Sequence, residues 1–108
     1  MSDNIKDSIK KILEEKKAID IKEICVKDET IITDYFILAS GTSITHIKSL
    51  SEHLEYELSK LDIKTRQIEG DKNSGWILMD YGDVIVHIFL PEVRERYRLD
   101  LLNHKAQE

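Results

Sequence analysis

The fold of this chain follows from one stretch of its sequence, WILMDYGDVIVHIF, which occupies residues 76–89. Two apolar runs flank Gly82 and Asp83, and a glycine at the first central position favours a type II′ turn between two antiparallel strands. With a two-residue turn, Leu78 lies opposite His87. Because directly opposed residues share one face of a sheet, this register assigns every side chain of the hairpin to a face.

The two faces of this predicted hairpin differ in character. One is almost purely aliphatic and consists of Ile77, Met79, Val84, Val86 and Ile88, with Tyr81 at its end. The other carries Trp76, Leu78, Asp80, Ile85, His87 and Phe89. We expect the aliphatic face to pack against helices and the mixed face to be exposed, since an imidazole and a carboxylate are costly to bury without partners. The residue pattern leaves open the alternative that a further helix covers the mixed face and that Trp76 is core.

Outside the hairpin, apolar spacing predicts three helices and three more strands. The predicted elements are a helix ending near Lys16, strands at 19–26 and 33–39, a helix over 44–61 after Gly41-Thr42-Ser43, a short strand at 63–68, and a helix from Pro91 with Val93, Tyr97 and Leu101 on one face. The tail from Asn103 is expected to be frayed. This order predicts a single α/β domain with a mixed, five-stranded sheet flanked by helices.

The length and the net charge of the chain limit the classes of function that it can have. At 108 residues, the chain is expected to form one domain over 1–108. Lys and Arg number 16 against 21 Asp and Glu, for a net charge of −5, which argues against nucleic-acid binding through a general electrostatic field. A basic protein partner suits such a surface better.

The single cysteine and the absence of long apolar runs predict where the protein works. Cys25 cannot form an intramolecular disulfide, and its apolar neighbours suggest a buried, structural role. No stretch approaches the length of a membrane span, and residues 1–4 do not resemble a signal peptide. We therefore expect a cytoplasmic protein with no membrane association.

Several stretches together resemble the ribosomal silencing factor S, or Iojap-like, family. They are the block 33–43, the pair Glu69-Gly70, the segment 75–89, and Arg94 with 96–100, and they span nearly the whole chain. The resemblance implies a nucleotidyltransferase-like fold without its catalytic carboxylates. It also implies a translational repressor that binds the fourteenth ribosomal protein of the large subunit and sterically blocks joining of the small subunit under starvation or in stationary phase.

The resemblance also implies a docking surface on the hairpin. The family's motif falls on Trp76, Asp80, Tyr81, Gly82, Asp83, His87 and Phe89. We expect Trp76, Leu78, Ile85 and Phe89 to be apolar anchors, and Asp80, Asp83 and Glu69 to accept hydrogen bonds from basic groups of the partner. Tyr81 and Asp83 would reach the partner from the turn. His87 taken alone is more typical of a satisfied structural histidine, and Asn103 stands where the family often has a tryptophan.

An enzyme is the main alternative. The Gly41-Thr42-Ser43 turn at a predicted helix N-terminus resembles the phosphate-holding turn of nucleotidyltransferases. Such an enzyme also needs closely placed carboxylates for magnesium, and no Asp-x-Asp follows this turn. Asp80 and Asp83 bracket a turn, which is more typical of surface polarity than of a metal site. We therefore predict no catalysis, no cofactor and no metal.

Two further partners remain open. An exposed apolar face can pair two copies of the chain into a homodimer away from the ribosome. Arg94, Arg96 and Arg98 indicate a solvated, mixed-charge helix face, with minor contact to rRNA phosphate as the alternative. His46 and His53 are seven residues apart, a spacing unlike that of metal ligands on one helix, and we expect both to face solvent.

Overall fold

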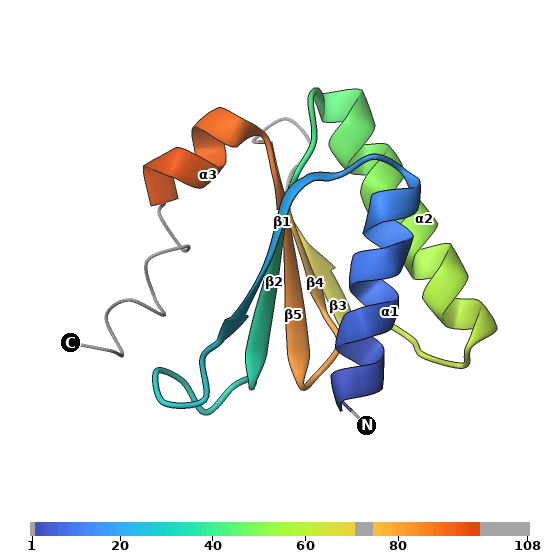
Figure 1. The fold of residues 1–108 in the computed structure, drawn as a ribbon, viewed down its shortest axis with the longest axis vertical. Coiled ribbons are helices and arrows are strands. Elements are labelled where there is room, and N and C mark those ends of the chain that lie inside the picture. Colours follow the sequence, from blue (N-terminus) through green and yellow to red (C-terminus); the bar gives the residue numbers. More distant parts are fainter. Residues whose placement is uncertain (1, 71–74, 98–108) are drawn as a thin grey trace.

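The structure is a computed structural model and describes residues 2–70 and 75–97. Its elements, shown in Figure 1, are α1 (Ser2–Glu15), β1 (Ile19–Cys25), β2 (Tyr35–Ser40), α2 (Ile44–Lys60), β3 (Gln67–Glu69), β4 (Trp76–Asp80), β5 (Val84–Phe89) and α3 (Pro91–Tyr97). Their order is the predicted one. The predictions for Leu101, for Arg98 and for the tail from Asn103 lie outside the described residues.

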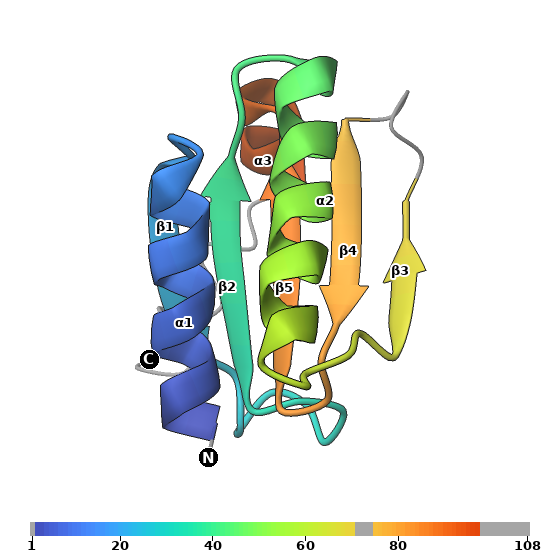
Figure 2. The same cartoon turned by 90° about the vertical axis from the view of Figure 1, so that its right-hand side faces the viewer.

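The strands form one mixed sheet in the order β1-β2-β5-β4-β3. β2 and β5 run parallel, and the other three neighbouring pairs are antiparallel. Helices α1 and α2 lie side by side on one face of the sheet, as Figure 2 shows, and α3 lies on the opposite face. The predicted α/β class with a mixed five-stranded sheet flanked by helices is therefore confirmed.

The central hairpin has the predicted register. Leu78 pairs with His87 and Trp76 with Phe89. Gly82 has φ +88°, a conformation that favours glycine, and its N–H donates to Asp80 Oδ1 at 2.7 Å. The two-residue turn predicted from the sequence is therefore confirmed.

The aliphatic face of the hairpin packs against α1 and α2, as predicted. Met79, Val84, Val86 and Ile88 are fully buried in one cluster. The helices contribute Ile9, Ile12 and Leu13 from α1 and Ile47, Leu50, Leu54 and Leu58 from α2. These spacings of three and four residues place each helix's apolar stripe on the sheet, and burial of this stripe stabilises both helices.

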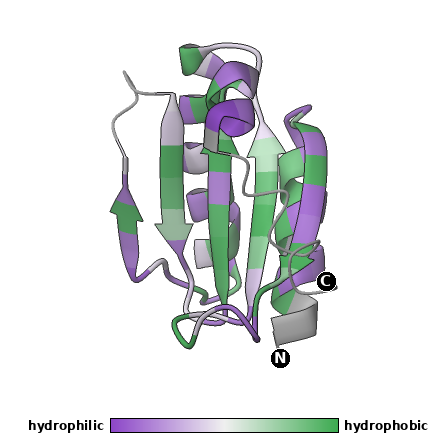
Figure 3. Cartoon of the chain, turned by 90° about the vertical axis from the view of Figure 1, so that its left-hand side faces the viewer, coloured by the Kyte–Doolittle hydropathy of each residue, from purple (hydrophilic) through white to green (hydrophobic). Residues whose placement is uncertain are grey.

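The expectation that the mixed face is exposed is wrong for strand β5, where α3 covers one end of the face as in the alternative. Phe89, His87 and Ile85 are only 0%, 4% and 8% exposed, respectively. A second apolar cluster forms on this side of the sheet and contains Ile24, Val26, Leu38, Phe89 and Val93, with Phe36, Trp76 and Leu90 packed against it. Figure 3 shows α3 across one end of this face, with β3 and β4 beside it and no described helix in front of them. Side chains on this face are therefore buried on β5, half-buried on β4 and exposed on β3.

Strand β3 begins later than predicted because the end of α2 uses more residues. Ile63 N–H donates to Leu58 O at 2.9 Å, and Asp62 has φ +64°. This pattern is typical of a helix that ends with a left-handed residue, so Ile63 still belongs to the helix terminus. The strand is consequently limited to Gln67–Glu69.

Cys25 is exposed, which corrects its predicted burial. It lies at the end of edge strand β1 and pairs with Tyr35. Its neighbours Ile24 and Val26 are fully buried on the α3 side of the sheet. Since successive strand residues alternate in direction, Cys25 points away from that cluster.

Three side chains that were expected in solvent hold elements together instead. His46 Nδ1 accepts from Thr42 N–H at 2.9 Å, and its Nε2 lies 2.8 Å from Lys16 O, so it joins the start of α2 to the end of α1. His53 Nε2 lies 3.3 Å from a carboxylate oxygen of Glu15 in α1. Arg94 donates to Asp20 O and to Ser40 Oγ, which ties α3 to β1 and β2.

Candidate functional site

The candidate site is the face of the sheet opposite α1 and α2, over strands β3, β4 and β5. The strand register places Gln67, Glu69, Trp76, Leu78, Asp80, Ile85, His87 and Phe89 on this face. Of the nine residues expected to contact a partner, seven lie on this face and Asp83 lies in the turn between β4 and β5. The ninth, Tyr81, lies elsewhere.

Four rings form the base of this surface. His87 stacks on Phe89 with ring centroids 5.8 Å apart and an angle of 6° between the planes. Phe36 from β2 meets His87 edge-on at 4.6 Å, and Trp76 lies 5.0 Å from Phe89. Such tilted and offset contacts are favourable ring arrangements, and they hold the half-buried Trp76 in one orientation. We call Phe36, Trp76, His87 and Phe89 the ring cluster.

His87 is only partly satisfied inside the ring cluster. Its Nδ1 accepts a hydrogen bond from Trp76 Nε1–H at 3.1 Å, so the neutral ring carries its proton on Nε2. Within the described part of the chain, this buried Nε2 has no partner. Burial lowers the pKa of His87 from 6.5 to about 4. The imidazole is therefore neutral at pH 7 and forms part of an apolar base rather than a charged contact.

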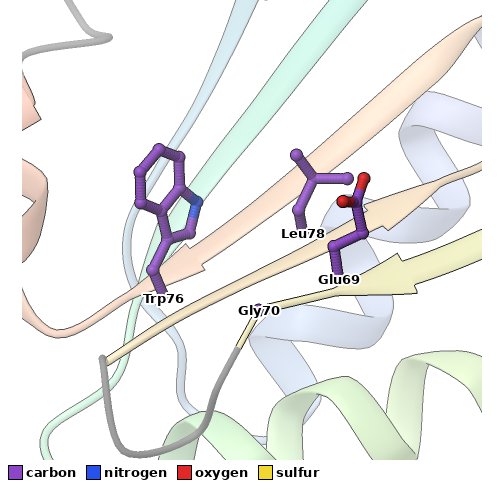
Figure 4. Close-up of a pocket in the computed structure, with 4 residues that line it drawn as sticks. All are labelled: Glu69, Gly70, Trp76 and Leu78. Carbon is purple, nitrogen blue, oxygen red and sulfur yellow. The ribbon is translucent and has the colours of Figure 1, made fainter.

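A small pocket opens beside the ring cluster. Glu69, Gly70, Trp76 and Leu78 line it, and its volume is about 210 Å³. Figure 4 shows the side chains of Glu69, Trp76 and Leu78 on the same side of strands β3 and β4. Trp76 and Leu78 are half-buried, whereas Glu69 is exposed. The pocket thus combines two apolar walls with one carboxylate, which we call the Trp76–Leu78 pocket.

The turn end of the surface presents fewer free groups than expected. Asp80 is half-buried and uses Oδ1 to accept from Gly82 N–H, while Asp83 is exposed. Tyr81 is buried against the helices with the aliphatic face, and its hydroxyl has no partner among the described residues. The structure therefore does not bring Tyr81 to the candidate face, because it is the next residue after Asp80 and points to the other side.

The predictions from the sequence did not include an apolar loop that lies next to this surface. Ile31 and Ile32 are strongly exposed in the connection between β1 and β2. Just after them, Asp34 N–H and Tyr35 N–H both approach Asp83 O at 3.1 Å, so this connection lies against the hairpin turn. Two adjacent isoleucines directly after the polar run 27–30 were the available signal.

The groups of the Gly41-Thr42-Ser43 turn that a nucleotidyltransferase-like enzyme would need for phosphate already make hydrogen bonds within the chain. Thr42 N–H donates to His46 Nδ1, and Ser43 Oγ accepts from His46 N–H at 3.1 Å, so the turn before α2 caps its own helix. Among the described residues there is no group of three or more His, Cys, Asp or Glu side chains that could hold a metal ion. No described helix has both the length and the apolar character needed to cross a membrane.

Known proteins resemble this chain over most of its length. Ribosomal silencing factor RsfS of Haemophilus influenzae is 35% identical over 86 residues, which are 80% of this chain and 84% of that protein. RsfS of Zymomonas mobilis is 33% identical and covers 82% of this chain, which spans 66% of that protein. Mouse "Mitochondrial assembly of ribosomal large subunit protein 1" is 34% identical over 89% of this chain, which spans only 43% of it.

Solved structures and a family model agree with these relatives. A crystal structure of a Chromobacterium violaceum protein matches with a TM-score of 0.89 and 30% identity, covering 94% of this chain and 85% of that one. One from Bacillus halodurans matches with a TM-score of 0.81 and 25% identity, covering 93% of each chain. The model of a family described as "Ribosomal silencing factor during starvation" matches residues 2–108, and its members are named as silencing factors, not as enzymes. The chain therefore belongs to the RsfS family of ribosomal silencing factors.

Proposed function

We propose that this chain binds the large ribosomal subunit through ribosomal protein fourteen of that subunit and blocks joining of the small subunit, which represses translation under starvation or in stationary phase. Membership of a family of ribosomal silencing factors supports the ribosome as the target. We infer the docking surface from the half-buried side chains of Trp76 and Leu78, which lie at the ring cluster on a face with no described helix in front of β3 and β4.

The expected contact residues divide into two groups. Trp76 and Leu78 have accessible apolar surface and serve as anchors, since interfaces concentrate their binding energy in a few such side chains. Ile85, His87 and Phe89 lie on the neighbouring strand β5, are buried, and act as support rather than as contacts. A supported anchor loses little conformational entropy on binding, so a small surface of this kind can bind specifically.

The charges around the anchors favour a basic partner. Glu69, which pairs with Leu78 from β3, and Asp83, in the β4–β5 turn, are both exposed. The chain as a whole carries a net charge of −5. Complementary charge at the rim of an interface speeds association and selects the partner, and this contribution weakens as salt rises. We therefore expect binding to depend on ionic strength.

Steric blocking requires only bulk. The accessible surface of the chain is 6559 Å², and a standard interface covers about 800 Å² on each partner, roughly an eighth of that surface. Most of a body measuring 37 × 32 × 21 Å therefore remains outside the interface. This body occupies the space that the small subunit would fill, and no chemical step is needed.

The remaining proposals follow from the same surface. The protein acts in the cytoplasm. Away from the ribosome, the Trp76–Leu78 area can pair with a second copy of the chain to form a homodimer. For rRNA phosphate, Arg96 is the exposed candidate on α3, because Arg94 is already bonded to Asp20 and Ser40.

The test is sedimentation of the protein with purified large subunits. Trp76→Ala and Leu78→Gln should each reduce the fraction that comigrates with the large subunit. Tyr56→Ala is the matched control, because Tyr56 is an exposed aromatic residue on α2, on the opposite side of the sheet. Unchanged comigration of both site variants at full solubility would contradict the proposed surface.

A further inference from the structure

The Trp76–Leu78 pocket combines apolar side chains with a carboxylate, and this combination favours one kind of ligand. Glu69 pairs with Leu78 across β3 and β4, and Trp76 precedes Leu78 by two residues on β4. Directly opposed residues have side chains about 5 Å apart, and residues two apart on a strand point to the same side. The three side chains therefore face one space, as Figure 4 shows.

The walls and the rim of this pocket differ in polarity. An aliphatic chain can pack against the indole of Trp76 and the side chain of Leu78. The Glu69 carboxylate at the rim makes no side-chain hydrogen bond or ion pair within the described residues, and it is exposed. A purely apolar ligand would leave this carboxylate without a partner, and an anion would be repelled by it.

Close backbone packing fixes one edge of the pocket, beside Glu69. Gly70 has φ +109°, and a Cβ at this position would lie 2.2 Å from Trp76 O. Only glycine fits there, because the missing side chain lets the backbone at the end of β3 lie directly against the start of β4. The indole itself is held by its hydrogen bond to His87 and by its contact with Phe89. The pocket is thus formed before any ligand arrives.

We propose that this pocket is a subsite for a single arginine side chain of the protein partner. Arginine carries a three-carbon stem that packs on apolar surface and a planar guanidinium that stacks on an indole and donates to a carboxylate. Each of these groups has its counterpart here: Leu78 for the stem, Trp76 for stacking and Glu69 for the fork of donors. The proposal deepens the proposed function, on which it rests for the source of the arginine.

The pocket can be tested without the ribosome, because Trp76 is the only tryptophan of the chain and its fluorescence reports on the pocket. The probe is N-acetyl-arginine amide, titrated at constant ionic strength. A fragment of this size is expected to bind with a Kd on the order of 1 to 10 mM. N-acetyl-norleucine amide, which has an apolar stem and no charge, and N-acetyl-lysine amide are the comparison probes.

The expected result is a saturable change with the arginine probe, a weaker one with lysine, and no saturation with norleucine. Glu69→Gln should weaken arginine binding by about three- to tenfold, as loss of a charged acceptor does. Glu52→Gln, at an exposed carboxylate on α2, should bind arginine like the original chain. Equal responses to arginine and norleucine, an unchanged Kd in Glu69→Gln, or no saturation by about 50 mM would each overturn the proposal.

The subsite and the proposed function fail separately. If the arginine titration fails while the original chain still comigrates with large subunits, the subsite is wrong and the ribosomal function stands. If arginine binds through Glu69 but the chain does not comigrate with large subunits, the pocket is correct and its partner is a different basic protein.

Discussion

Trp76 Nε1–H donates a hydrogen bond to His87 Nδ1 at 3.1 Å, across the neighbouring strands β4 and β5. This bond links the half-buried Trp76 of the proposed docking surface to the buried His87. It also sets the tautomer of the imidazole and, with the stacking on Phe89, fixes the angle of the indole. The stability of the ring cluster and the shape of the proposed docking surface should therefore depend on the same two residues.

Two substitutions of Trp76 should separate the contribution of ring packing to stability from that of the hydrogen bond. We expect Trp76→Phe to lower the free energy of unfolding by about 1 to 2 kcal/mol, because His87 Nδ1 loses its donor. Trp76→Ala should cost about 2 to 4 kcal/mol, because it also removes the packing against Phe89. Urea denaturation measures both values. An unchanged stability of Trp76→Phe would show that the hydrogen bond contributes nothing, and equal costs for the two variants would show that the packing against Phe89 contributes nothing.

The buried imidazole should make stability depend on pH. The pKa of His87 is lowered to about 4 in the folded protein, whereas an unfolded histidine titrates near 6.5. Between these values the unfolded chain binds more protons, so the free energy of unfolding should fall as the pH drops from 6.5 to 4. The full loss from this group is about 3 kcal/mol.

His87→Phe removes this titration and should flatten the pH dependence of unfolding between pH 6.5 and 4. The NMR signal of the His87 ring is identified as the one missing from the spectrum of His87→Phe. In the original chain, this signal should remain that of a neutral ring until the pH approaches about 4. A midpoint near 6.5 for that signal would show that the ring is hydrated rather than buried.

Glycine substitutions should differ according to the space around each Cβ. Gly70→Ala places a methyl group 2.2 Å from a backbone oxygen at φ +109°, so we expect a loss of about 3 kcal/mol or more. Gly82→Ala meets only the flexible end of Arg66 at 3.2 Å and should cost about 1 kcal/mol. Melting temperatures rank the two variants, and a smaller loss at Gly70 than at Gly82 would contradict the close packing of β3 on β4.

Much of the architecture was predictable because the signals are local. The turn at Gly82 and Asp83 sets the register of the hairpin, and alternation along β4 and β5 then determines which side chains share a face. The periodic leucines of α2 and the cap at Ser43 likewise act over a few residues. These features need no knowledge of distant contacts, and the structure confirms them.

Which residues cover a face of the sheet depends on contacts between residues that are far apart in the sequence. The predictions that depended on such contacts were wrong. The burial of Phe89 depends on Val93 of α3 and on Ile24 and Leu38 of two other strands. The role of Arg94 depends on Asp20, which is 74 residues away in the sequence. Exposure of Cys25 follows from the edge position of β1 in the strand order. None of these relationships leaves a periodic signal in the chain.

Charge reversal should affect docking without affecting the fold. Glu69→Lys and Asp83→Lys change exposed side chains, so we expect stability to stay within about 0.5 kcal/mol while affinity for the large subunit falls. The loss should be greater at low salt than at high salt. Glu52→Lys on α2 makes the same change of charge on the opposite side of the sheet and is the control. An equal loss in all three variants would point to net charge rather than to this surface.

The most direct test of the account is a subunit-joining experiment. Small and large ribosomal subunits are mixed in joining buffer with the original chain, with Trp76→Ala or with Tyr56→Ala, and separated on a density gradient. We predict that the original chain and Tyr56→Ala comigrate with the large subunit and abolish the joined particle, whereas Trp76→Ala allows joining. Normal formation of the joined particle with the original chain bound, or with the chain left at the top of the gradient, would contradict steric blocking by this surface.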